Sequence, residues 1–222
     1  ELYEPQTKID VEVNTTSITF VGSAFQYSYK VISKSNSIQN VYLMAFELPE
    51  APLEPIAPHG WIKPNEMSYR LDSGRKDSTG IKAYVWLSDD TEVFDIRPGQ
   101  SLEGISFKSS ELPGIRLFFA QGYTLNDMPE GEFTSEEMDS IFGDDKLDFF
   151  VNSVSSKTVL PEAVKDQSLT ALIERLVSLK HQSAALGWIY GPGEDGIVKS
   201  LDAKLDAARE SAGKGNNKAA EN

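Results

Sequence analysis

The strongest constraint on the fold is the alternation of apolar and polar residues in the first half of the chain. Residues 25–31 read Phe-Gln-Tyr-Ser-Tyr-Lys-Val, and a period of two is typical of a strand with one buried face. Further strand-like segments lie at 8–13, 41–48, 81–87 and 116–120. Short strands separated by turn residues predict an antiparallel β-sandwich of immunoglobulin-like type over residues 1–160.

An irregularity is expected in the strand near residues 101–107. Leu102 has the opposite parity to Ile105 and Phe107, so the three side chains share a face only if the strand holds one extra residue. Glycine tolerates the backbone of a β-bulge, so we expect the bulge at Gly104.

Three segments interrupt the pattern of strands. Asn14-Thr15-Thr16 matches a glycosylation acceptor, but a polar turn is the simpler interpretation. Residues 51–64 contain four prolines, which predicts an irregular crossing. A capping box of Thr134 and Glu137 predicts a short helix over 134–142, inserted before strand character returns at 147–159.

The end of the chain changes to a helical period. Ser168 is a suitable N-cap for a helix with apolar residues at three- and four-residue spacing, which ends near Gly187. A second helix is expected over about 195–212. We therefore predict a helical hairpin over 165–222, and a helical start after residue 216 suggests a truncated module that continues past Asn222.

Composition excludes several classes of function. The net charge of -13 argues against nucleic-acid binding and against docking on anionic membranes. No segment is apolar enough for membrane insertion. The absence of cysteine excludes disulfides and thiolate chemistry, and two histidines, His59 and His181, give little material for metal or triad sites.

The helical region resembles a known module of secreted, multi-domain bacterial proteins, the FIMAH-type domain. The residues that carry the resemblance are Ser178-Leu179-Lys180-His181-Gln182, Leu186-Gly187-Trp188-Ile189, Gly196-Ile197, Ser200-Leu201-Asp202-Ala203-Lys204-Leu205, Ala208, Gly215-Asn216 and Ala219-Ala220. The chain departs from the family by an insertion at 190–194 in the interhelical loop. The resemblance implies export and an interaction or spacer role, without a catalytic residue. More loosely, residues 98–107 are similar to uncharacterised exported bacterial β-sandwich regions.

Two groups of residues are candidate ligand sites. Trp86 and Tyr84 share one strand face, and with Trp61 they are candidates for a platform on which sugars stack, although aromatic core is the simpler interpretation. Acidic clusters are candidates for calcium, which prefers oxygen ligands, although neither follows the common loop pattern and solvated acidic turns are the default. These clusters are Asp144, Asp145 and Asp148, and Asp89, Asp90 and Glu92. No other cofactor is indicated.

The sequence favours a non-enzymatic extracellular or cell-surface protein of bacterial origin. It would act as a structural, adhesive or spacer module, with protein or glycan surfaces, or further copies of itself, as partners. One alternative is a carbohydrate-binding module that uses the exposed aromatics. Another is a fibre subunit in which residues 9–13 add as a strand to a neighbouring sheet. An enzyme that depends on His59 is a more distant alternative.

Overall fold

The computed structural model describes residues 7–64, 69–71, 81–89, 93–123, 153–189 and 194–215. The chain divides into two compact units, Glu1–Glu162 and Ala163–Asn222. The first unit holds all of the described strands, and the second holds both described helices.

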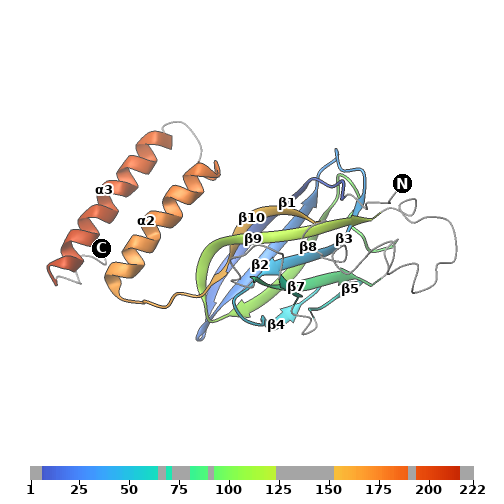
Figure 1. Cartoon of the computed structure of the whole chain (residues 1–222), viewed down its shortest axis with the longest axis horizontal. Coiled ribbons are helices and arrows are strands. Elements are labelled where there is room, and N and C mark those ends of the chain that lie inside the picture. The colour runs from blue at the N-terminus through green and yellow to red at the C-terminus, as the bar shows by residue number, and fades with distance from the viewer. Residues whose placement is uncertain are drawn as a thin grey trace. The chain divides into compact units, whose positions relative to one another are not determined.

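Two antiparallel sheets pack face to face in the first unit (Figure 1). The four-stranded sheet has the order β1-β2-β8-β4, with bounds Val11–Val21, Ala24–Ser33, Ser101–Ser109 and Leu53–Ile56. The six-stranded sheet has the order β10-β9-β3-β7-β5, with bounds Val154–Glu162, Leu112–Tyr123, Asn40–Glu47, Ile81–Ser88 and Trp61–Ile62. Its sixth strand, β6 (Tyr69–Leu71), pairs with β7. The predicted antiparallel sandwich is confirmed.

The order of the strands is that of an immunoglobulin domain of the constant type. In that fold, strands A, B, E and D form one sheet and C, F and G form the other. Taken along the chain, β1, β2, β3, β4, β8, β9 and β10 occupy positions A to G. The remaining strands, β5 to β7, form an insertion between D and E, and β7 extends the second sheet beyond C.

The first strand is longer than its sequence suggested. β1 runs without a break from Val11 to Val21 and pairs with β2 along its length, so the turn predicted at Asn14-Thr15-Thr16 is wrong. A register shift between Thr15 and Ser17 absorbs Thr16 as a bulge. Threonine has a high β propensity, so polar residues here continue the strand.

The turn between β1 and β2 comes later, at Gly22 and the serine that follows. Gly22 has φ +66, as a two-residue hairpin loop with glycine at its first central position requires.

The predicted bulge in β8 is confirmed. Tyr29 of β2 pairs with Ile105, whereas Lys30 pairs with Glu103, so Gly104 is the extra residue. Gly104 has φ +94, a backbone conformation that residues with a side chain rarely adopt. The bulge places Ile105 and Phe107 in the core at 0% exposure.

The proline-rich segment is more regular than predicted. Residues 51–64 contain β4 and β5 rather than an irregular crossing alone. Both strands lie outside the centre of their sheets, where a proline such as Pro55 does not remove a needed hydrogen bond.

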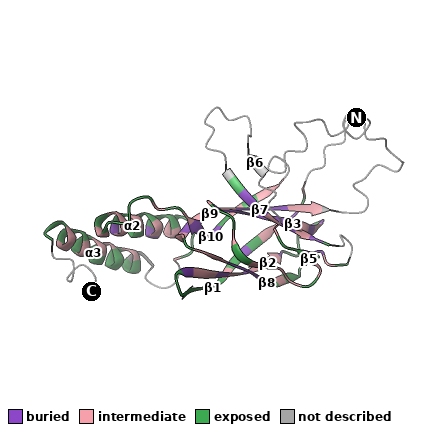
Figure 2. Cartoon of the chain, turned by 90° about the horizontal axis from the view of Figure 1, so that it is seen from below, coloured by how far each residue is buried: buried purple, intermediate pink, exposed green. Residues whose placement is uncertain are grey.

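Aromatic rings fill the space between the two sheets. Six of them contact one another at centroid distances of 4.9–6.1 Å: Tyr27, Tyr29, Phe46, Trp86, Phe107 and Phe118. In antibody domains a disulfide joins strands B and F beside a tryptophan of strand C. Here Phe46 of β3 contacts both Tyr29 of β2 and Phe118 of β9, at 4.9 and 5.1 Å. Packed rings therefore link strands B and F through strand C, and Figure 2 shows that buried residues lie along the strands of both sheets.

The second unit is a hairpin of two helices, α2 (Leu169–Ala185) and α3 (Glu194–Gly213). The predicted N-cap is confirmed, because the Ser168 side chain accepts a hydrogen bond from the Ala171 amide at 3.3 Å. Lys180 of α2 is buried and forms an ion pair with Asp202 of α3. Neither described helix is long and apolar enough to cross a bilayer. The helices predicted at 134–142 and after residue 216 lie outside the described residues.

Candidate functional site

The three aromatic residues proposed as a sugar platform are core residues. Trp86 is 0% exposed, Trp61 6% and Tyr84 8%. The indole nitrogens donate inward, from Trp86 to the Ile56 carbonyl at 3.2 Å and from Trp61 to the Phe94 carbonyl at 3.0 Å. These residues present no open ring face on which a sugar could stack.

The predicted calcium ligands Asp144, Asp145 and Asp148 lie outside the described residues, as do Asp90 and Glu92 of the second cluster. Within the described part of the chain, no three or more histidine, aspartate or glutamate side chains gather as a metal site.

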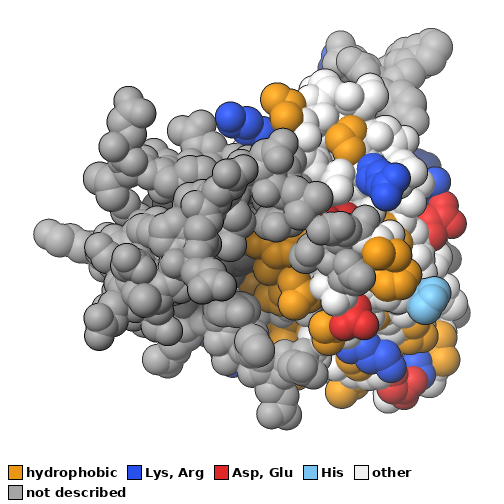
Figure 3. All heavy atoms as spheres, turned by 90° about the vertical axis from the view of Figure 1, so that its right-hand side faces the viewer, with side chains coloured by type: hydrophobic (Ala, Val, Ile, Leu, Met, Phe, Trp, Pro, Cys, Tyr) orange, Lys and Arg blue, Asp and Glu red, His pale blue; other side chains and the backbone are white. Residues whose placement is uncertain are grey.

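The two histidines lie in different units. His59 is exposed in the loop before β5, and its ring is tilted against Phe94 at 5.2 Å. His181 of α2 is 59% exposed at its side chain and lies 3.7 Å from Asp202. Figure 3 views one face, on which hydrophobic side chains are interspersed with Lys, Arg, Asp and Glu side chains. The charges on that face are therefore mixed rather than of one sign.

The best-defined polar feature of the sandwich joins its first and last strands, β1 and β10. Thr158 Oγ1 donates to the Val13 carbonyl at 3.2 Å. Thr15 Oγ1 lies 3.3 Å from both Thr158 Oγ1 and the Val159 carbonyl. Tyr29 OH, from β2, donates to the same Val159 carbonyl at 3.0 Å. These hydroxyl groups connect the open edges of two different sheets.

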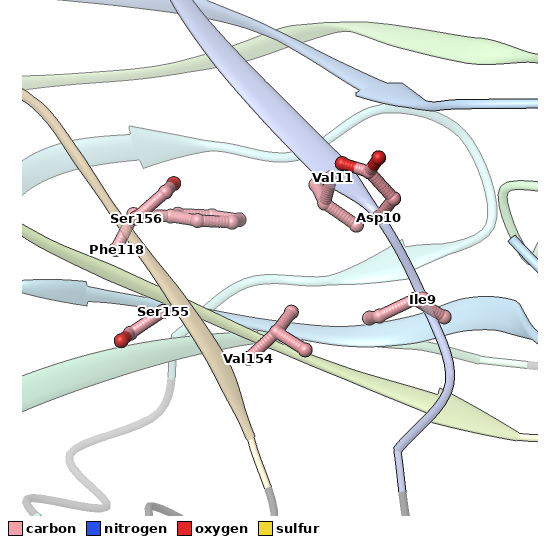
Figure 4. Close-up of a pocket in the computed structure, with 7 residues that line it drawn as sticks. All are labelled: Ile9, Asp10, Val11, Phe118, Val154, Ser155 and Ser156. Carbon is pink, nitrogen blue, oxygen red and sulfur yellow. The ribbon is translucent and has the colours of Figure 1, made fainter. Parts of the chain in front are cut away.

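A cavity of about 260 Å³ lies beside this contact, between residues 9–11 and 154–156 (Figure 4). The wall combines apolar side chains with one carboxylate and two hydroxyls: Ile9, Asp10, Val11, Phe118, Val154, Ser155 and Ser156. Ser156 Oγ is buried without a hydrogen-bond partner among the described residues. Ligand pockets usually have volumes of about 300–1,000 Å³, so this one fits a small group at most.

The cavity and the hydroxyl contacts together show that β1 and β10 run in the same direction. Residues 9–11 face 154–156, and Val13 and Thr15 face Thr158 and Val159. Residue numbers thus rise together on the two strands.

Asp10, which lines the cavity, is held as a carboxylate. A hydrogen bond from Asn36 Nδ2 at 3.0 Å lowers its pKa, and Lys34 at 3.5 Å acts in the same direction. The Asp10 amide also donates to Ser37 Oγ. These contacts suit Asp10 to anchor the start of β1 rather than to donate a proton.

We expect Tyr29 to make the sandwich sensitive to alkali. Burial, and to a smaller extent the nearby Tyr27, raise the pKa of the Tyr29 hydroxyl well above its ordinary value. A raised pKa in the folded state means that the contribution of Tyr29 to stability is intact below pH ~10 and is lost as the pH rises further. Tyr29→Phe should lower the free energy of unfolding by about 1 kcal/mol at neutral pH, and this deficit should shrink above pH ~10.

Urea denaturation of both proteins across this pH range measures the difference. The other tyrosines are common to both proteins and cancel. A deficit that stays constant with pH would contradict the assignment.

Sequence reasoning missed the polar contact between β1 and β10. It placed a turn where Thr15 lies and could not pair residues that are 143 positions apart, as Thr15 and Thr158 are. The available signal was the stretch from 15 to 21, in which every residue except Ser17 is β-branched or aromatic, a composition that favours a continued strand.

No protein-family model and no curated protein matches this chain. Among solved structures, it is similar to an uncharacterized protein from Nocardia farcinica whose crystal structure reveals an immunoglobulin-like fold. The identity is 15% over 56% of this chain and 88% of that one, with a TM-score of 0.34.

Proposed function

We propose that the chain is a non-enzymatic structural module of an exported bacterial protein, in which the sandwich acts as a spacer and the helical hairpin as a docking element. The observation that carries this proposal is the parallel course of β1 and β10. Because the first and last strands run the same way, the chain enters the sandwich at one end and leaves it at the other (Figure 1). At ~3.3 Å per residue, the length of β1 separates these ends by about 36 Å.

This geometry also determines how the sandwich meets a pulling force. A force on the two ends acts along β1 and β10 in opposite directions and shears their contacts. Shearing loads the Thr15, Thr158 and Val159 contacts together, whereas peeling would break them one after another. A module with this arrangement suits a position within a chain under tension.

The helical hairpin supports the second part of the proposal through the FIMAH-type resemblance. The ion pair of Lys180 and Asp202 joins two of the segments that carry the resemblance. On the hairpin, Leu176 is 53% exposed and Ile197 is 45% exposed. Side chains of this kind provide apolar contact area for a partner protein.

Single-molecule stretching of the full chain, with handles at its two ends, tests the spacer role. We expect Glu1–Glu162 to unfold in one step that lengthens the chain by up to ~3.6 Å per unfolded residue. The force of this step should be well above the force that unfolds the helices. The nearly isosteric Thr158→Val removes hydroxyl contacts to Val13 and Thr15 and should lower that force.

Tyr27→Phe is the matched control. It removes a partly buried hydrogen bond to the Glu111 carbonyl at 2.9 Å, which is not part of the contact between β1 and β10. It should change the unfolding force less than Thr158→Val does. A sandwich that yields at the same force as the helices would refute the spacer role.

Export is tested separately in the source bacterium. Antibody detection after fractionation should find the protein in the medium, or on intact cells in a form that added protease degrades. Retention inside protease-treated cells would contradict export and leave the mechanical result unaffected.

A further inference from the structure

The second half of β1 is an open sheet edge without the usual protection. We infer that this edge, residues 16–21, pairs with the same edge of a second copy of the chain to form a two-fold symmetric dimer. The inference is independent of the proposed spacer function.

The edge is exposed and available. All six residues from Thr16 to Val21 are exposed, and Phe20 reaches 63% and Val21 47%. Among the described strands, β2 alone pairs with β1. The contacts with β10 described above involve Val13 and Thr15 and do not reach this segment.

Two other described edge strands, β4 and β10, carry the protection that this segment lacks. Edge strands usually carry charges or proline, or are very short. β4 has four residues and includes Glu54 and Pro55, and β10 includes Lys157 and Pro161. From Asn14 to Val21 there is no charge, no proline and no glycine.

The charge of the chain limits where a second copy can approach. At a net charge of -13, two copies repel each other over most orientations. An uncharged strip is the part of the surface where they approach at the least electrostatic cost.

The edge is also complementary to itself. Val21 and Ala24 close the two-residue hairpin loop, so Val21, Thr19 and Ser17 direct their backbone groups to β2. The alternate residues Ile18 and Phe20 direct theirs away from the sheet.

In antiparallel pairing centred on Thr19, Ile18 of each copy lies opposite Phe20 of the other copy. This register makes two apolar cross-strand pairs and places the two Thr19 residues opposite each other, with no charge on either side. The two four-stranded sheets become one continuous sheet.

The first test uses the absence of cysteine in this chain. Thr19→Cys puts a single thiol at the two-fold axis, in a pair that is not hydrogen-bonded, where Cα atoms lie ~4.5 Å apart and a disulfide fits. Mild oxidation of the full chain should give a covalent dimer. Ser101→Cys, exposed on the interior strand β8, should give far less.

The second test is sedimentation equilibrium of the wild type and of Thr19→Lys. The wild type should show a monomer–dimer equilibrium, and opposed lysines should weaken association by roughly tenfold or more. Ser101→Lys adds the same charge away from the edge and should leave association unchanged. Circular dichroism verifies that each variant is folded.

Four results would overturn the inference, and three of them concern the wild type and the variants above. They are a wild-type chain that stays monomeric at millimolar concentration, equal association of wild type and Thr19→Lys, and equal cross-linking of the two cysteine variants. Growth into longer polymers would also overturn it, because a two-fold pair of edges is closed.

Discussion

Replacing Phe46 by alanine is expected to lower the free energy of unfolding of the sandwich by about 3–5 kcal/mol. Phe46 is 0% exposed and contacts four other rings: Tyr29, Trp86, Phe107 and Phe118. The loss has two parts. The variant lacks the hydrophobic free energy that the ring gains when it is buried, and it contains a cavity that the two closely packed sheets cannot close. Urea denaturation followed by tryptophan fluorescence measures it, because Trp86 lies 5.0 Å from Phe46.

Ile38→Ala serves as the control for Phe46→Ala. Ile38 is 71% exposed, so its truncation should change the free energy of unfolding by less than about 0.5 kcal/mol. A similar, small loss for both variants would show that the rings do not form one packed cluster.

Replacing Asp202 by alanine is expected to open the helical hairpin. Lys180 is 5% exposed at its side chain, and Asp202 is its ion-pair partner. Removal of the carboxylate leaves a buried ammonium without its counter-charge, which costs about 3–5 kcal/mol in buried pairs, and the 37% exposure of Asp202 places the expected loss at the lower end. A hairpin of two helices has little stability to lose, so far-UV circular dichroism should show a clear loss of helix while the strands remain.

Asp206 provides the matched control, one helical turn further along α3. It pairs with Arg209 at 2.9 Å, but both side chains are more than half exposed, so Asp206→Ala should change stability by less than about 0.5 kcal/mol. The double variant Lys180→Met with Asp202→Leu should restore the helix, because an apolar pair replaces the buried charges. Full helicity in Asp202→Ala would contradict the structural role of the pair.

The parts of the fold that depend on local chemistry could be predicted from the sequence. In a regular strand, Leu102 and Ile105 would point to opposite faces, so a common face required one extra residue between them. Gly104 is that residue, and it adopts φ +94. Ser168 likewise marked the start of α2, because its hydroxyl is suited to the free amides of a first turn.

The parts that depend on tertiary packing could not be predicted. Trp86 and Tyr84 alternate with Val85 and Leu87, so both strand faces are apolar and the pattern alone does not show which one faces the core. The tryptophan face is inside because β3 and β7 pair Met44 with Trp86 and turn both toward the opposite sheet. The sequence also could not predict that β7 pairs with the open side of strand C, because no local sequence pattern determines the order of strands in a sheet.

The aromatic contact between β2, β3 and β9 has a consequence for where this sandwich can fold. Antibody domains depend on an oxidising compartment to close the bridge between strands B and F. Here the rings of Tyr29 and Phe118 both pack against Phe46, which links the same two strands without a covalent bond. Because the chain also has no cysteine, we expect a reductant to leave the stability of the sandwich unchanged.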